Sequence, residues 1–278
     1  ADSSAQTTPT GISLMGVAVS SGAGVLVGLL DTGIDLNHPD LSVAGGIDYT
    51  GSRKGSYDDD NGHGTHTAGS IAGLDNSVGV VGVAPAADLY AVKVLDRRGS
   101  GSYSGIINGV DWATANNMDV ISMSLGGSAS SATLQASLAS AAAAGVITVV
   151  AAGNSGNDLD SSPEYPAAYA ADGTLIAVSA YDVDTDTWAY FTNYSSGLGL
   201  VGIAADGMTV CSTTYDGAYG EKSGTSMATP AVAGAAALYV QTHAAAELAG
   251  FEAALRADAE PLADTAQHQE DLANVSGW

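Results

Sequence analysis

Nearly continuous apolar runs alternate with helical patterns through most of the chain. The strand-like runs cover 25–30, 89–95, 120–125, 146–151 and 175–180, and the helical patterns cover 63–74, 104–117 and 131–144. Uninterrupted apolar runs of this length are typical of strands that are covered on both faces. The alternation predicts a three-layer α/β/α fold with a mostly parallel sheet. Because no linker or repeat interrupts it, we expect a single domain over residues 1–278.

A later apolar run, 231–240, is too long and too rich in alanine for a strand, and it predicts a buried helix. Pro230 just before it is tolerated only near a helix start. Ser226, in the sequence Gly-Thr-Ser-Met-Ala-Thr-Pro at 224–230, is therefore expected at or just before the first turn. Free N–H groups and the helix dipole favour developing negative charge there. Ser226 is then either a nucleophile or an N-cap.

Polar residues follow several of the strand-like runs. Asp31 follows the first run, Gly126 the third and Asn154 the fourth. In open parallel sheets, binding sites form beyond the carboxyl ends of the strands, so we expect a site here. Alone, Asn154 is a typical turn residue, but beside a nucleophilic serine its amide becomes an oxyanion donor.

Asp31 belongs to the triplet Asp-Thr-Gly at 31–33. A buried carboxylate needs hydrogen-bond partners, so Asp31 either pairs with another functional group or caps a loop. The triplet is also the signature of aspartic proteases, which need two carboxylates that share a proton. The second candidate, Asp264, lies in an acidic C-terminal stretch, and the α/β alternation argues against the β-rich fold of that class. We therefore disfavour the aspartic-protease hypothesis.

Two histidines stand at the start of the first helical pattern, in Asn-Gly-His-Gly-Thr-His at 61–66. Their spacing would suit a metal ligand pair, but the zinc-protease pattern His-Glu-x-x-His is absent. Glycines on both sides of His63 let another backbone and a substrate approach, as a general base requires. We expect His66 to be a structural histidine of the core.

The composition is acidic, with seven Lys and Arg against thirty Asp and Glu, for a net charge of −23. Nucleic acids and anionic membranes are disfavoured as partners, since both need a cationic surface. No stretch of eighteen apolar residues predicts a membrane span. The lone cysteine, Cys211, excludes an internal disulfide. The first six residues lack a basic leader and an apolar segment, so we expect a cytosolic protein or a mature form without its targeting segment.

The order Asp31, His63, Asn154 and Ser226, each in its own motif, resembles the subtilisin-like serine proteases of the subtilase family. The resemblance runs from about residue 5 to about residue 243. It implies a secreted, monomeric serine endopeptidase of broad specificity, acting on proteins and peptides through an acyl-enzyme. Ser226 would attack the peptide carbonyl, and His63 would transfer the proton. Asp31 would orient His63, while Asn154 would bind the oxyanion. A propeptide or protein inhibitor is a further partner that the family implies.

The same resemblance implies a substrate cleft with two edges and a primary pocket. These sites would be formed by Gly99, Ser100, Gly101, Ser124, Leu125, Gly126, Gly127, Ala151, Ala152, Gly153 and Glu164. Glu164 departs from the family, which often has a small residue there. Its carboxylate would favour basic substrate residues if it faced the pocket, but we expect it to face solvent.

The resemblance also implies a structural calcium ion at the loop 74–80. Its ligands would be the carbonyls of Leu74, Val78 and Val80 and the side chains of Gln6, Asp40 and Asn76. Such an all-oxygen set suits calcium. Two further functions stay open, a catalytically silent scaffold with this fold and an esterase with the same triad.

Overall fold

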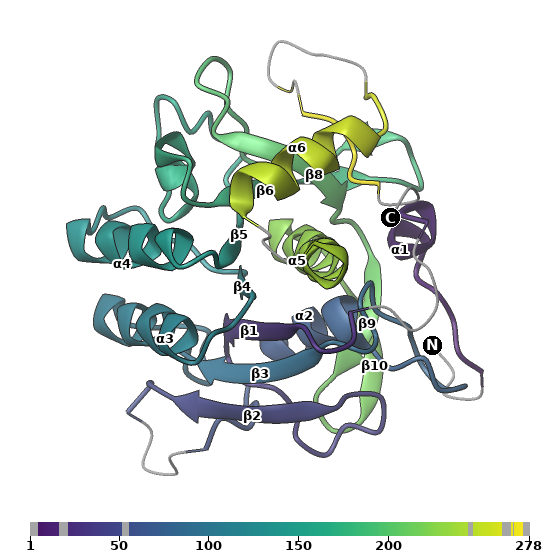
Figure 1. Ribbon diagram of the computed structural model, residues 1–278. Helices are drawn as coiled ribbons and strands as arrows, with labels where there is room; N and C mark the ends of the chain where they lie inside the picture. Colours follow the sequence, from purple (N-terminus) through teal and green to yellow (C-terminus); the bar gives the residue numbers. More distant parts are fainter. Residues whose placement is uncertain are drawn as a thin grey trace.

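A parallel sheet forms the centre of the protein, whose computed structural model describes residues 5–16, 22–51, 56–243, 247–262, 268 and 270–274 (Figure 1). In chain order its strands are β1 (Leu26–Asp31), β2 (Val43–Asp48), β3 (Asp88–Lys93), β4 (Val120–Met123), β5 (Ile147–Ala151), β6 (Ile176–Asp182), β7 (Thr187–Trp188) and β8 (Val201–Asp206). They lie in the order β2-β3-β1-β4-β5-β6-β7, and β8 also pairs with β6. Every pair is parallel except β6 with β7.

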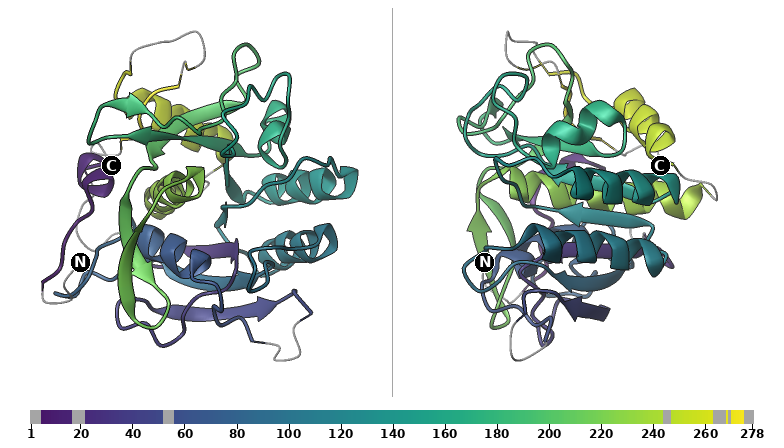
Figure 2. Two further views of the ribbon diagram at one scale, coloured as in Figure 1. Left: turned by 180° about the vertical axis from the view of Figure 1, so that it is seen from behind. Right: turned by 90° about the vertical axis from the view of Figure 1, so that its left-hand side faces the viewer.

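Helices cover both faces of this sheet, which confirms the predicted α/β/α layers (Figures 1 and 2). One face carries α2 (His63–Ala72) and α5 (Thr225–Thr242), and the other carries α3 (Tyr103–Ala115) and α4 (Ala132–Ala143). The remaining elements are α1 (Thr10–Leu14), the short helix η1 (Ala167–Asp172), the hairpin β9 (Val210–Thr214) and β10 (Ala218–Lys222), and α6 (Leu248–Asp258).

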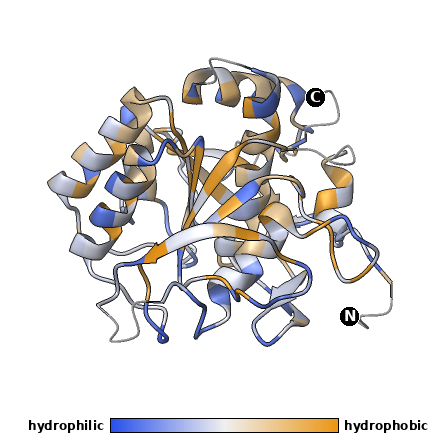
Figure 3. Cartoon of the chain, turned by 60° about the horizontal axis from the view of Figure 1, so that its bottom comes forward, coloured by the Kyte–Doolittle hydropathy of each residue, from blue (hydrophilic) through white to orange (hydrophobic). Residues whose placement is uncertain are grey.

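Alternation along each strand divides the apolar residues between two cores. Leu29 packs with the residues of α2 and α5, whereas Leu30 packs with those of α3 and α4. Both side chains are buried, because successive strand residues point to opposite faces and both faces are covered. Figure 3 shows the apolar colour gathered on the central strands and the polar colour on the surrounding loops.

The predicted helices at 63–74, 104–117 and 131–144 are confirmed as α2, α3 and α4, within a few residues at each end. The run 231–240 lies inside α5. The strands missed from the sequence are the half-buried β2, the two-residue β7, the glycine-containing β8 and the polar hairpin β9–β10. The C-terminal stretch also contributes a helix, α6, whose Phe251 is fully buried in the core.

Candidate active site

The first site residue is carried by the start of α2, where two glycines shape the backbone. Gly62 precedes the helix with a φ of 93°, a conformation that side-chain-bearing residues rarely adopt. A β-carbon on Gly64 would lie 2.1 Å from the carbonyl oxygen of Gly33. Only glycine therefore lets α2 approach the end of β1 this closely. The approach brings His63 to Asp31.

Asp31 and His63 form a tight pair, in which Asp31 is buried and His63 is partly exposed. The His63 Nδ1 atom lies 2.7 Å from Asp31 Oδ1 and 2.9 Å from Oδ2. Asp31 is fully buried, and its carboxylate also accepts hydrogen bonds from Thr32 N at 2.7 Å and from Thr67 Oγ1 at 3.3 Å. These contacts fix the carboxylate and hold the Nδ1 edge of the ring toward it. The Nε2 edge is left for a reactant.

The two histidines of this helix have opposite electrostatics. The charge of Asp31 raises the pKa of His63 above its ordinary value, against the opposing effect of burial. Burial lowers the pKa of His66 to about 4, and its Nε2 lies 3.1 Å from the carbonyl oxygen of Val210. His66 is thus a neutral core residue, as the sequence predicted. His63 is the histidine that is suited to exchange protons.

Ser226 lies in the first turn of α5, as the second residue after the N-cap Gly224. The N-cap interpretation of Ser226 is therefore wrong. Pro230 lies in the second turn, and since proline has no N–H, it cannot bond to the carbonyl of Ser226. That carbonyl instead accepts a hydrogen bond from Ser124 Oγ at 2.9 Å. Ser124, just after the end of β4, thus supplies the donor that Pro230 lacks and joins this segment to the start of α5.

The hydroxyl of Ser226 contacts the carbonyl oxygen of Ser124 at 3.5 Å. Among the described residues no hydrogen bond joins it to His63. Free enzymes often show such loose geometry, which tightens when substrate binds. Rotation about one side-chain bond redirects the hydroxyl, since Ser226 is only partly buried.

Asn154 is oriented by Thr225, the first residue of α5. Its Oδ1 accepts hydrogen bonds from Thr225 N at 2.8 Å and from Thr225 Oγ1 at 3.0 Å. Because a backbone N–H can only donate, these contacts fix the amide oxygen against the helix. The N–H₂ group of Asn154 is left to donate elsewhere.

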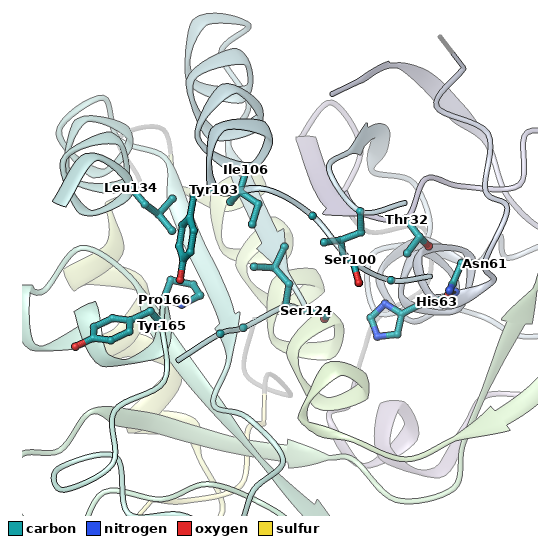
Figure 4. Close-up of a pocket in the computed structure, with 16 residues that line it drawn as sticks. Thr32, Asn61, His63, Ser100, Tyr103, Ile106, Ser124, Leu134, Tyr165 and Pro166 are labelled. Atoms are coloured by element: carbon teal, nitrogen blue, oxygen red, sulfur yellow. Dashed lines mark hydrogen bonds between the residues drawn. The ribbon is translucent and has the colours of Figure 1, made fainter. Parts of the chain in front are cut away.

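A cleft of about 400 Å³ opens from His63 toward Tyr165 and Pro166 (Figure 4). Seven predicted cleft residues line it, namely Gly99, Ser100, Gly101, Ser124, Leu125, Gly126 and Gly127. Sequence reasoning did not assign the apolar lining residues Leu95, Ile106 and Leu134 to the cleft. These residues belong to the apolar patterns of the predicted strands and helices, and such patterns are equally typical of core residues. The predicted Ala151, Ala152, Gly153 and Glu164 lie outside this lining, at the end of β5 and in the loops that follow.

Residues 22–277 match the sequence model of the subtilase family of peptidases. The chain belongs to the subtilase family. It is 44% identical to the subtilisin of Bacillus pumilus, over 98% of both chains. It is also 48% identical to subtilisin Savinase of Lederbergia lenta, over 85% of this chain and 86% of the relative. A solved cold-adapted subtilisin-like serine proteinase superposes with a TM-score of 0.81 at 35% identity, covering 92% of this chain and 90% of that one.

This subtilase is therefore a subtilisin-like serine endopeptidase with the predicted fold. The match extends well beyond residue 243, where the sequence alone suggested that the resemblance ends. The C-terminal stretch is thus part of the family pattern. Among the described residues no helix is long and apolar enough to cross a membrane.

The loop between α2 and β3 in this subtilase surrounds the carboxylate of Asp40. Asp40 is fully buried, and burial raises its pKa, while it accepts hydrogen bonds from Asn76 Nδ2 at 2.8 Å and Val80 N at 2.9 Å. Gln6 spans the loop, since its Nε2 donates to Leu74 O at 3.0 Å and its Oε1 accepts from Ser77 N at 3.1 Å. Among the described residues no cluster of three His, Cys, Asp or Glu side chains could hold a metal. Besides the single carboxylate of Asp40, any cation here would depend on amide and carbonyl oxygens.

Proposed function

We propose that this subtilase hydrolyses peptide bonds with Ser226 as nucleophile, His63 as base and Asp31 as the residue that orients the base. The observation that carries the assignment is the Asp31–His63 pair at 2.7 Å, since α2, which carries His63, packs against α5, whose first turn presents Ser226. The raised pKa of His63 supports it, because a base must hold a proton during the reaction.

In the first half of the reaction, Ser226 Oγ forms a bond to the peptide carbonyl carbon, and His63 Nε2 takes the hydroxyl proton. The carbonyl oxygen becomes an oxyanion, which the Asn154 N–H₂ group and the Ser226 backbone N–H stabilise. Helix α5 adds the positive end of its dipole at the same place. His63 then gives its proton to the leaving amine, the C–N bond breaks, and an ester of Ser226 remains. Water attacks this ester in the same way and releases the acid.

The substrate would bind as an extended strand between the segments 99–101 and 124–127. Both segments line the cleft, and their glycines leave room for a second backbone. Backbone hydrogen bonds supply most of the affinity in this mode, so specificity is broad. Tyr103, Ile106 and Leu134 form an apolar recess farther from His63, which suits an apolar side chain upstream of the cleaved bond.

The test separates the endopeptidase from the scaffold and the esterase. Casein and a matched pair of peptide amide and peptide ester substrates are incubated with the protein and with Ser226→Ala. We expect hydrolysis of casein, of the amide and of the ester by the wild type, and none above background by the variant. Ester cleavage without amide cleavage would favour the esterase, and no cleavage by folded protein would favour the scaffold.

We also propose a structural calcium ion at the loop around Asp40. The support is chemical: Gln6 Nε2 donates to Leu74 O at 3.0 Å and Asn76 Nδ2 donates to Asp40 Oδ1 at 2.8 Å, so the same loop carries a buried carboxylate, carbonyls and amides. The amide oxygens of Gln6 and Asn76 accept hydrogen bonds from Ser77 N and Val78 N, and their remaining lone pairs, with the carbonyls of Val78 and Val80, would complete the oxygen set that calcium prefers. Calcium would stabilise the loop and take no part in the reaction. Chelation should lower the thermal midpoint of the wild type and leave Asp40→Asn unchanged; equal midpoints before and after chelation of the wild type would contradict this.

The remaining assignments concern location and partners. We propose that the chain is secreted and acts as a monomer, and that a propeptide or a protein inhibitor occupies the same cleft. The likeness to bacterial subtilisins and the net charge of −23 support an extracellular enzyme without nucleic-acid or membrane partners. Size-exclusion chromatography with light scattering tests the monomer.

A further inference from the structure

The ends of two neighbouring strands lie beside the start of α5, which presents Ser226, and we call the region between these ends the slot. β4 and β5 run parallel, and past their ends the segments 124–126 and 151–153 continue on either side of the start of α5. Ser124 Oγ bonds to the carbonyl oxygen of Ser226, and Gly153 N bonds to Thr225 Oγ1 at 3.2 Å. In the proposed function the carbonyl carbon of a bound peptide is held at Ser226, and the side chain of that residue, called P1, would then enter this slot.

The far side of the slot is closed by residues 164–166. Tyr165 is held to the first edge by two backbone hydrogen bonds, from Gly127 N to Tyr165 O at 2.9 Å and from Tyr165 N to Gly127 O at 2.8 Å. The ring of Tyr165 packs on that of Tyr169 at 4.8 Å, and Pro166 is buried. The residue before this anchored turn is Glu164. Its position is thus fixed by backbone contacts on its C-terminal side.

The carboxylate of Glu164 faces the strand ends, and the expectation that it faces solvent is wrong. Its Oε1 accepts a hydrogen bond from Ser155 Oγ at 2.6 Å. A β-carbon on Gly153 would lie 2.4 Å from Oε2, and one on Gly126 would lie 4.0 Å from the same atom. Oε2 therefore lies between the two edges of the slot. A side chain at position 153 would collide with this oxygen and one at position 126 would contact it, so glycine at both positions keeps other side chains away from it.

No cation of the described chain neutralises this carboxylate. The ion pairs of the described Lys and Arg residues join Lys93 to Asp60, Arg98 to Asp96 and Arg256 to Glu252. The partner of Glu164 is the neutral hydroxyl of Ser155, which orients Oε1 and leaves the negative charge in place. A half-buried carboxylate with a fixed orientation attracts a cation more strongly than a fully solvated one does.

We propose that Glu164 selects lysine or arginine at P1, as a graded preference within an otherwise broad specificity. This inference rests on the proposed function, in which Ser226 attacks the carbonyl of the P1 residue. The extended Lys or Arg side chain would enter the slot and place its cationic end against Oε2. An acidic P1 residue would be repelled, and an apolar one would leave Glu164 without a counter-ion.

The test compares peptide substrates that differ only at P1, with Lys, Leu, Phe or Glu. The variant Glu164→Gln keeps the shape and an acceptor oxygen for Ser155, and removes the charge. Glu247→Gln is the matched control, since it removes the same charge from an exposed position at the start of α6. Each preparation is first titrated with a phosphonofluoridate, so that kcat/KM refers to reactive Ser226.

We expect the wild type to prefer Lys over Leu and Glu, and the Lys-to-Leu ratio to fall about tenfold in Glu164→Gln. Added salt should narrow the ratio in the wild type and leave it unchanged in Glu164→Gln. The Glu247→Gln control should keep the wild-type ratio. An equal Lys-to-Leu ratio in wild type and Glu164→Gln, or no preference for Lys over Glu, would overturn this inference while the titration still supports Ser226. Absence of titration would instead count against the proposed function itself.

Discussion

Replacing Asp31 by asparagine tests the link between the geometry of the site and its chemistry. In Asp31→Asn the new amide oxygen must stay on Thr32 N, because that N–H only donates. The amide nitrogen then replaces Oδ2 and faces His63 Nδ1, at the position where Oδ2 lies 2.9 Å away. His63 must accept at Nδ1 and carry its proton on Nε2. The nitrogen that should take the proton of Ser226 is then already protonated.

The size of the effect follows from the contacts that are lost. The carboxylate makes two contacts with His63, at 2.7 and 2.9 Å, and both strengthen when the ring becomes charged. A hydrogen bond to a charged group contributes about 1.5–3 kcal/mol. The amide of asparagine carries no charge, so neither contact keeps this charge-assisted strength. The barrier therefore rises by about 3–6 kcal/mol, which is roughly 10²–10⁴ in kcat. About 10⁴ is the loss known for this change in another triad protease.

The assay is kcat and KM for an amide peptide at several pH values, with thermal unfolding as a check on folding. Asp58→Asn is the matched control, since Asp58 is exposed and its carboxylate accepts from Leu36 N and makes no contact with His63. We expect kcat to fall at least a hundredfold in Asp31→Asn, with KM and the thermal midpoint nearly unchanged. A fall of less than tenfold, or the same fall in Asp58→Asn, would refute the reasoning.

Three further predictions concern pH and packing. Since Asp31 raises the pKa of His63, and activity needs neutral His63, the acid limb of kcat/KM should have its midpoint above pH 6.5, and a midpoint below 6 would count against the pair. Burial raises the pKa of Asp206 to about 7, so the folded protein keeps a proton that the unfolded chain loses near pH 4, and stability falls as pH rises through this window. Measured by urea unfolding in a Ser226→Ala background, Asp206→Asn should gain up to about 4 kcal/mol relative to its parent between pH 4 and 8; a constant difference would contradict this. In urea unfolding, Phe251→Ala should lower the free energy of unfolding by about 3–5 kcal/mol. A much smaller loss would mean that α6 lies outside the cooperative core.

The sequence predicted most elements that are covered on both faces and missed those that are half-buried or polar; it also missed β8, which is buried but interrupted by Gly202. The runs of β1 and β4 are apolar throughout because helices cover both sides of the sheet. β2 is an edge strand, and its Gly45 and Gly46 carry no side chain that could show a pattern. The hairpin β9–β10 is polar, so its pairing depends on contacts with α2 that are remote in sequence.

The residue types of the candidate site were readable from motifs, whereas their orientations were not. Asp31 and His63 stand 32 positions apart, and only the close packing allowed by Gly64 brings them together. The orientation of Glu164 depends on Ser155 and on the turn anchored at Gly127, which no local pattern encodes. Pro230 lies in the second turn rather than near the helix start. The carbonyl of Ser226, which proline cannot bond, is bonded instead by Ser124, a contact that is remote in sequence.

The central claim is that Ser226 is a nucleophile activated by His63. A phosphonofluoridate reacts with such a serine and not with ordinary surface serines, and mass spectrometry of the digested protein locates the adduct. We predict one adduct per chain, on Ser226, formed much more slowly in Asp31→Asn and absent in His63→Ala. An unlabelled folded protein, or an adduct on another residue, would contradict the account.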